Sequence, residues 1–291
     1  MAEITAKAVK ALRDRTGAGM MECKRALGEA DGDADKAIEV LRERGLAKAV
    51  KRSGRATSEG TVAISLGDRV AGIVELGCET DFVAKTADFQ ALAASLAKSL
   101  VDDTGIDGRE VLLDATVGGE KVSEKISAAI GKVGENILLN RCERIAVEGS
   151  GKVGGYVHAG GKLGVLVGLA TEASGEALDV LAKDLAMHVA AADPSPVAVD
   201  RDGVPQELIE REKNLFRRQA EQEGKPAKVI DKIVEGRVKK YYGEVCLLEQ
   251  SFVTDPDKSL SQLLEEVGAQ LSSPVSITSF VRFKLGESAS E

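Results

Sequence analysis

The chain has 291 residues, a formal net charge of −8, 43% hydrophobic residues and only 3% aromatic residues. This length allows two domains, or one domain with an excursion, and the core must be built mainly from Ala, Val, Leu and Ile. The negative charge argues against nucleic acid as the main ligand, because phosphate binding needs a cationic face. No apolar run approaches the roughly 20 residues of a membrane span, and no secretory signal follows Met1. The four widely spaced cysteines are expected to be reduced thiols in a cytoplasmic protein.

Residues 1 to about 45 predict three short helices. Thr5 is a suitable N-cap for the first helix, which should end at Gly17. Asp33 should cap the third helix, and Gly45 should end it.

The small bundle formed by these helices is expected to have a marginal core. Val9 and Leu12 lie on the inner face of the first helix. Met20 and Met21 in the second helix either fill the core or remain partly exposed, where flexible methionine suits a binding surface. A basic stretch then runs from Arg42 to Arg55 with Glu43 as its one counter-charge. It predicts a solvated linker, and the alternative is a contact with ribosomal RNA.

An internal repeat follows, in which residues 64–76 align without gaps to residues 157–169 at an offset of 93. Each copy reads strand, glycine turn, strand, and so predicts a hairpin. The helices that follow match at the same offset. Residues 144–148 and the alternating run 281–285 can each supply one further strand. Two similar α+β halves are therefore expected.

Thr80, Asp81 and Phe82 should lie at a corner between the first repeat and its helix. Thr80 suits the N-cap of the helix that contains Phe89, and Asp81 suits its first turn. Phe82 has two interpretations: it staples the helix start to the core, or it projects with Asp81 as a wedge into a partner.

Two charged amphipathic segments follow the break at residues 193–196. They flank the turn Gly224-Lys225-Pro226, where Gly ends one helix and Pro opens the next. Their narrow apolar stripes predict an antiparallel helical hairpin that projects from the core.

Two motifs lack the context that their chemistry needs. Residues 149–154 spell G-x-G-x-x-G, but a hairpin is expected next rather than the helix of a dinucleotide site. Asp31, Asp33 and Asp35 begin like a calcium loop, but the required Gly and Glu are replaced by Lys36 and Arg42. We therefore expect no metal site and no cofactor.

The two histidines, His158 and His188, have no nucleophile paired with them by any local signal. His188 lies on the second core helix and is expected to have a hydrogen-bonded structural role. His158 lies near a glycine turn at the tip of a hairpin. No catalytic residue is assigned.

Several blocks, in order, resemble the elongation factor Ts family. They cover residues 15–24, 80–85, 131–137, 156–158, 186–191 and 234–240, and the resemblance runs from about Ile4 to Leu285. Gly77 departs from the family pattern, where Asn is common before the Cys, and this change could loosen the corner.

The resemblance implies an α+β fold with a ubiquitin-associated-like three-helix domain at residues 1–50. A basic linker at 51–59 would precede the N-terminal half of the core at 60–150. The C-terminal half would comprise 151–199 and 243–286, interrupted by a coiled-coil hairpin at 200–242 that meets a partner or a second copy of the chain.

The resemblance also implies a function: a guanine-nucleotide exchange factor in translation elongation, without enzymatic activity. Its partner would be elongation factor Tu, in the GDP-bound and nucleotide-free forms, and self-association would use the core or the coiled coil. Thr80, Asp81, Phe82 and Val83 would form the wedge that displaces Mg²⁺ and phosphate-site elements of the partner. Further partner contacts are expected at Leu12, Met20, Met21 and His158. The competing hypothesis is a small-molecule enzyme that uses the glycine-rich region at 149–164.

Overall fold

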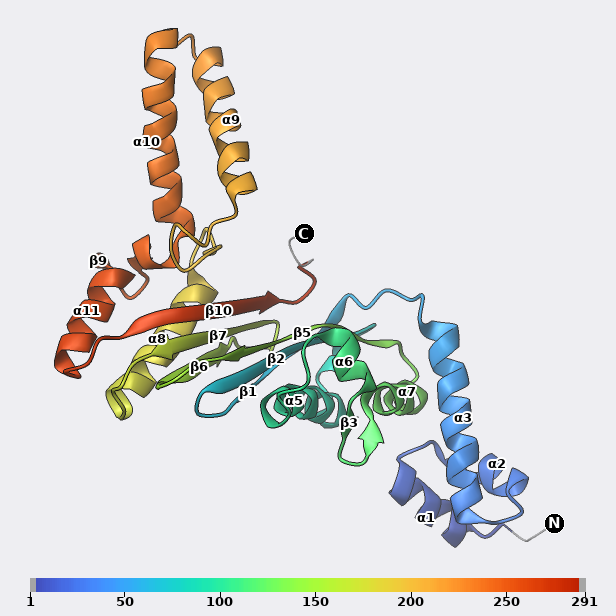
Figure 1. The fold of residues 1–291 in the computed structure, drawn as a ribbon. Helices are drawn as coiled ribbons and strands as arrows, with labels where there is room; N and C mark the ends of the chain where they lie inside the picture. The colour runs from blue at the N-terminus through green and yellow to red at the C-terminus, as the bar shows by residue number, and fades with distance from the viewer. Residues whose placement is uncertain (1–3, 288–291) are drawn as a thin grey trace.

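The computed structural model describes residues 4–287, and three helices begin the chain (Figure 1). They are α1 (Ala6–Thr16), α2 (Met20–Glu29) and α3 (Ala34–Arg52). Thr5 caps α1 by accepting from the Ala8 amide, Asp33 caps α3, and Gly17 ends α1 in the left-handed conformation, all as predicted. The three helices share their own small apolar core, which includes Leu12, Cys23 and Leu27.

Helix α3 corrects two of the sequence predictions. It does not end at Gly45 but continues to Arg52, because Gly45 is buried where α3 crosses α7 (Val122–Val133). A Cβ on Gly131 of α7 would lie 3.1 Å from the Gly45 Cα, so two glycines allow this close crossing. Three of the predicted linker cations instead lie on this helix and form ion pairs, Arg42 with Glu124, Arg44 with Glu29 and Lys48 with Glu22.

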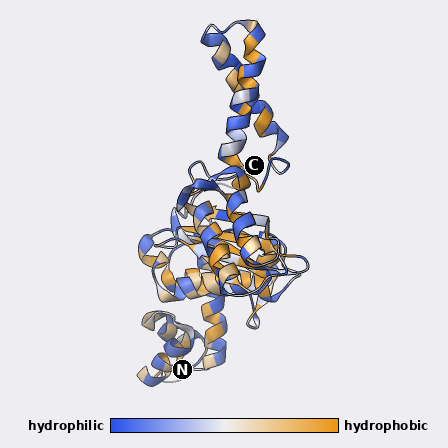
Figure 2. Cartoon of the chain, turned by 90° about the vertical axis from the view of Figure 1, so that its left-hand side faces the viewer, coloured by the Kyte–Doolittle hydropathy of each residue, from blue (hydrophilic) through white to orange (hydrophobic). Residues whose placement is uncertain are grey.

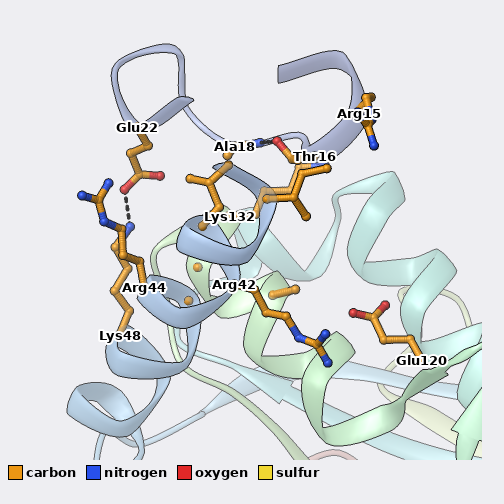
Figure 3. A pocket seen from close by; sticks show the side chains of 14 residues that line it. Arg15, Thr16, Ala18, Glu22, Arg42, Arg44, Lys48, Glu120 and Lys132 are labelled. Atoms are coloured by element: carbon orange, nitrogen blue, oxygen red, sulfur yellow. Dashed lines mark hydrogen bonds and ion pairs between the residues drawn. The ribbon is translucent and has the colours of Figure 1, made fainter. Parts of the chain in front are cut away.

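A cavity of about 350 Å³ lies where the three-helix bundle meets α7 (Figure 3). Arg15, Thr16 and Ala18 line it from the bundle, and Lys132 lines it from α7. Lys132 packs against Gly17 and donates to Asp88 at 2.6 Å, so one side chain links the turn after α1 to the start of α5 (Ala87–Asp102).

The first sheet has the order β1-β2-β5, formed by β1 (Glu59–Leu66), β2 (Val70–Cys78) and β5 (Ile137–Ala146). The predicted hairpin is present as β1 and β2. The third strand begins at Ile137, not Arg144, and a bulge at Asn140, opposite the Glu75–Leu76 step, shifts its register. Between α5 and β5 lie α6 (Arg109–Asp114), β3 (Thr116–Val117), β4 (Glu120–Lys121) and α7.

The second sheet has the corresponding order β6-β7-β10, with β6 (Gly151–Val157), β7 (Leu163–Ala170) and β10 (Ser276–Lys284). The hairpin β6–β7 is followed by α8 (Glu176–Ala191), as β1–β2 is followed by α5. The remaining elements of this part are η1 (Leu247–Glu249), β8 (Ser251–Phe252), β9 (Asp255–Ser259) and α11 (Leu260–Gln270).

The two sheets pack against each other and each carries helices on its outer face. In β2, Ile73 faces the other sheet, whereas Val74 and Leu76 face α5. In β7, Leu166 faces the first sheet, whereas Val167 packs with α8 and α11. Both central strands are therefore covered on both faces, which explains their nearly continuous apolar sequences.

Two antiparallel helices, α9 (Gln206–Gln222) and α10 (Ala227–Val245), extend from the second half (Figure 1). Their facing sides bury a separate apolar cluster that includes Ile209, Ala220 and Val234, and hydrophilic residues alternate with hydrophobic ones along both helices (Figure 2). The hairpin and the three-helix bundle lie at opposite ends of an elongated molecule.

The root of the hairpin is fixed by a buried polar cluster around His188. Its Nδ1 accepts from the Val253 amide at 3.2 Å, so its Nε2 carries the proton and donates to Gln250 Oε1 at 3.0 Å. Gln250 in turn donates to the carbonyl oxygens of Pro194 and Glu244, which lie at the two ends of the excursion. His188 thus has the structural role expected of it. Among residues 4–287, no helix is both long and apolar enough to cross a membrane.

Candidate functional site

The corner between β2 and α5 holds an exposed aromatic ring. Phe82 lies in the short helix α4 (Asp81–Ala84), and its side chain is 81% exposed. Thr80 caps α4 rather than α5, because Thr86 starts a new helix two residues after α4 ends. Phe82 therefore points away from the core, whereas Ala84 and Phe89 belong to it.

A glutamate just before the neighbouring strand β5 clamps this corner. Glu135, in the loop between α7 and β5, accepts from the Thr80 amide at 3.0 Å and from Thr80 Oγ1 at 2.7 Å. The next residue, Asn136, is buried, and its amide donates to Glu79 at 2.7 Å. Hydrogen bonds to a charged acceptor contribute about 1.5–3 kcal/mol each. The ring therefore projects from a rigid support, although sequence reasoning gave these two residues no role.

Positive side chains surround the carboxylate of Asp81. Lys85 donates to it at 2.6 Å, and this hydrogen bond lowers the pKa of the Asp81 carboxyl below its ordinary value. The charge of Lys162 acts in the same direction. Asp81 is only partly buried, so it stays ionised at neutral pH and available to a second cation.

Cys78 precedes the corner but is not a nucleophile. Its side chain is fully buried, and its thiol donates to the Thr80 carbonyl oxygen at 3.1 Å. Burial, together with the charge of Glu135, raises the pKa of Cys78 to about 11, so the reactive thiolate is absent at neutral pH.

The turn that contains His158 is tied to the same part of the core. The Gly161 carbonyl oxygen accepts from the Val62 amide at 2.6 Å and from Thr61 Oγ1 at 3.3 Å. Gln90, the other partner of Thr61, donates to the Ala84 carbonyl oxygen of α4. His158 itself is exposed, and its Nδ1 lies 2.9 Å from the Tyr156 hydroxyl.

The three predicted contact residues of the N-terminal bundle have different environments. Met20 and Met21 are 48% and 62% exposed, so they form an apolar surface rather than the core. Leu12 is 1% exposed at the centre of the bundle. The expected direct contact of Leu12 with a partner is therefore wrong, since its side chain packs against α2 and α3.

The glycine-rich stretch at 149–154 does not form a nucleotide cradle. Gly151 begins strand β6, and no helix N-terminus follows it. Within residues 4–287, no group of three or more His, Cys, Asp or Glu side chains converges in the manner of a metal site.

Comparisons with known proteins agree on one family. The family model described as Elongation factor TS matches residues 79–287. The chain is 50% identical to "Elongation factor Ts" of Clostridium perfringens (strain SM101 / Type A), over 98% of this chain and 93% of the relative. It is 47% identical to "Elongation factor Ts" of Chlorobium phaeobacteroides (strain BS1), over 98% of this chain and all of the relative. The clamped corner lies at the start of the region that the family model matches. With these identities over nearly its full length, the chain belongs to the elongation factor Ts family.

Proposed function

We propose that this chain is the guanine-nucleotide exchange factor for elongation factor Tu and acts by inserting the Asp81–Phe82 corner beside the bound Mg²⁺ and phosphates. The observation that carries the proposal is the ring of Phe82, which is 81% exposed on a support clamped by Glu135. A solvent-exposed phenylalanine next to an ionised carboxylate gives one apolar group for displacing packed side chains and one anion for competing at the cation.

The mechanism is reciprocal linkage between two ligands of the partner. A factor that binds the nucleotide-free partner more tightly than the GDP-bound partner must weaken GDP binding by the same ratio. The factor contacts both the GDP-bound and the nucleotide-free partner, and the inserted corner shifts the equilibrium towards release of GDP. This chain then needs no nucleotide site and catalyses no chemical reaction.

The energy for holding the partner must come mainly from other surfaces. Burial of one Phe side chain contributes roughly 1.5–3 kcal/mol, which is about one to two decades in affinity. That is too little both to bind the partner tightly and to displace GDP. Met20, Met21 and the exposed His158 turn are the proposed additional contacts, and the corner directs their binding energy to the metal site.

Each region has a place in this proposal. Residues 1–50 form a ubiquitin-associated-like contact domain, joined by residues 51–59 to the two core halves at 60–150 and at 151–199 with 243–286. Residues 200–242 form a coiled coil that can meet the partner or a second copy. The protein acts in the cytoplasm, where its partner works.

The test is release of labelled GDP from elongation factor Tu in the presence of Phe82→Ala. Because the ring is exposed, the variant should keep its melting temperature and most of its binding free energy, while the exchange rate at saturating factor falls at least tenfold. Val180→Ala is the matched control, since Val180 is 52% exposed on α8 and should leave the rate unchanged. A normal exchange rate for Phe82→Ala would refute the wedge.

A further inference from the structure

The outer part of the α9–α10 hairpin has a charge opposite to that of the rest of the chain. Residues 211–240 contain ten Lys or Arg and five Asp or Glu, a balance of +5. Since the whole chain has a net charge of −8, the remaining residues have a net charge of −13. Positive charge is thus concentrated on the part of the molecule that projects furthest from the core (Figure 1).

Half of these ten cations form ion pairs within the hairpin or at its base, with four carboxylates between them. Arg217 pairs with Asp231, Lys225 and Arg237 with Glu223, Lys213 with Glu210, and Lys240 with Glu244. The other five are exposed and form no ion pair among the described residues. They are Arg211, Arg218, Lys228, Lys232 and Lys239.

The unpaired cations have a regular arrangement along each helix. Lys228, Lys232 and Lys239 are separated by four and seven residues, so they lie within about 40° of one another around α10. Glu235 is the one acidic residue on this stripe. Arg211 and Arg218, seven residues apart, share one face of α9 in the same way. These five residues are called here the cationic stripes.

The cationic stripes suit a polyanion better than a protein or a membrane. Protein interfaces are anchored by apolar and aromatic side chains and are depleted of lysine, and amphipathic membrane helices expose a broad apolar face. On the described surface of residues 211–240 the exposed large apolar side chains are Leu215 and Val229, at 37% and 41%. Phosphate contacts, in contrast, come mainly from Lys and Arg side chains.

The length of the hairpin allows an acidic protein to bind such a ligand. The 19 residues of α10 extend about 28 Å at about 1.5 Å per residue. Repulsion from the acidic core decays over about 8 Å at physiological ionic strength. The tip therefore lies several screening lengths beyond the core.

We propose that the cationic stripes on α9 and α10 form an RNA-binding arm that contacts the phosphate backbone without reading its sequence. This goes beyond nucleotide exchange, because the arm is separate from the Phe82 corner. The arm would hold the factor near RNA by a salt-dependent interaction.

The test is fluorescence anisotropy of the full chain with a labelled 20-base-pair RNA duplex, from 25 to 200 mM KCl. The triple variant Lys228→Gln, Lys232→Gln, Lys239→Gln removes one stripe from an exposed face, so the fold should be kept. We expect it to lower the affinity at least tenfold at low salt. The slope of log affinity against log salt should fall by about 3, at about one per phosphate contact.

A matched triple variant, Lys7→Gln, Lys10→Gln, Lys183→Gln, makes the same change in net charge at exposed positions outside the hairpin. It should leave RNA binding unchanged. No binding by the unmodified chain at 25 mM KCl, or an equal loss in both variants, would overturn the proposal. So would a stripe variant that binds RNA normally but forms a weaker complex with elongation factor Tu, because the arm would then be a protein contact. None of these three outcomes depends on the exchange rate, so they are distinguishable from a failure of the proposed exchange function.

Discussion

His188 is a buried histidine that is neutral in the folded chain. Its side chain is 1% exposed, and both ring nitrogens are engaged, one by the Val253 amide and one by Gln250. Burial lowers the pKa of His188 below its ordinary 6.5, and the hydrogen bond to Gln250 only partly opposes this. Because Val253 donates to Nδ1, a proton cannot be added there without loss of that hydrogen bond.

This lowered pKa predicts that the chain loses stability in mild acid. Between 6.5 and the folded-state pKa, the unfolded chain binds more protons, so the free energy of unfolding falls as pH falls. The contribution of one such group is at most about 1.4 kcal/mol per pH unit. Urea unfolding at pH 7.5, 6.5 and 5.5 should therefore show a steeper decline for the unmodified chain than for His188→Gln. Parallel profiles would mean that His188 does not titrate in this range.

At the scale of elements, the corner is supported by segments that are far apart in the sequence. The loop between α7 and β5 lies beside the end of β2. There Glu135 accepts two hydrogen bonds from Thr80, and the backbone amide of Asn136 donates to Glu79. Asn136 also donates to the Arg55 carbonyl oxygen at 2.8 Å, which attaches the segment before β1 to the same clamp. The position of Phe82 therefore depends on three connections between elements, not on α4 alone.

We predict that Glu135→Gln slows nucleotide exchange without preventing complex formation. The amide keeps the size of the side chain but loses the charge and one acceptor, so the two bonds from Thr80 weaken by about 1–3 kcal/mol in total. Stopped-flow measurement should give a several-fold lower GDP release rate at saturating factor, with a smaller change in the dissociation constant. Glu110→Gln is the control, because among residues 4–287 that exposed carboxylate pairs only with its neighbour Arg109. Equal losses in rate and in affinity would indicate a general structural defect instead.

At the scale of the whole molecule, the apolar contact surface and the Phe82 corner belong to separate parts. Met20 and Met21 lie on the N-terminal bundle, which has its own core and reaches the rest of the chain through α3 and α7. The corner belongs to the first sheet and its helices. This separation suggests that holding the partner and displacing its metal are divided between two supports.

The corresponding prediction is that Met20→Ser with Met21→Ser weakens the complex but preserves the rate of GDP release at saturation. Loss of two half-exposed methionines should raise the dissociation constant about 10-fold or more. Burial of each methionine side chain on binding contributes up to about 1.5–3 kcal/mol to the binding free energy. The methionine variant, Phe82→Ala and their combination complete a double-mutant cycle, in which calorimetry measures the dissociation constant and GDP release measures the exchange rate. The effects should add, because the sites share no side chain contact. Strong coupling would contradict independent supports.

The elements that could be predicted from the sequence are those with local signals. The hairpins β1–β2 and β6–β7, the caps Thr5 and Asp33, and the turn at Gly224 all follow from spacing and turn chemistry. Helix α7 was missed, although Val122, Ile126 and Ile130 recur at helical spacing. The extension of α3 could not be inferred either, because Gly45 ends a helix in isolation but here packs against Gly131.

The candidate site was predictable only where its signals are local in the sequence. The unusual pairing of Asp81 with Phe82 is visible in the sequence, and two interpretations of the ring followed from it. Only the three-dimensional arrangement gives its 81% exposure and the partnership of Thr80 with Glu135, which is 55 residues away. Leu12 shows the converse, since a residue on the inner face of a helix was also assigned to a partner contact, and its burial excludes that role.

The root of the hairpin has a consequence for how such proteins can vary in length. The Val197 amide donates to the Val245 carbonyl oxygen at 2.9 Å, and the Leu247 amide donates to that of Ala198 at 2.9 Å. The chain thus leaves and rejoins the core at adjacent, mutually bonded positions. Closing a loop between fixed ends costs only about 0.6 kcal/mol more for each doubling of its length. Turns of helix can accordingly be added or removed in matched pairs during evolution, and a reporter domain could be grafted at Gly224, while both sheets keep their register.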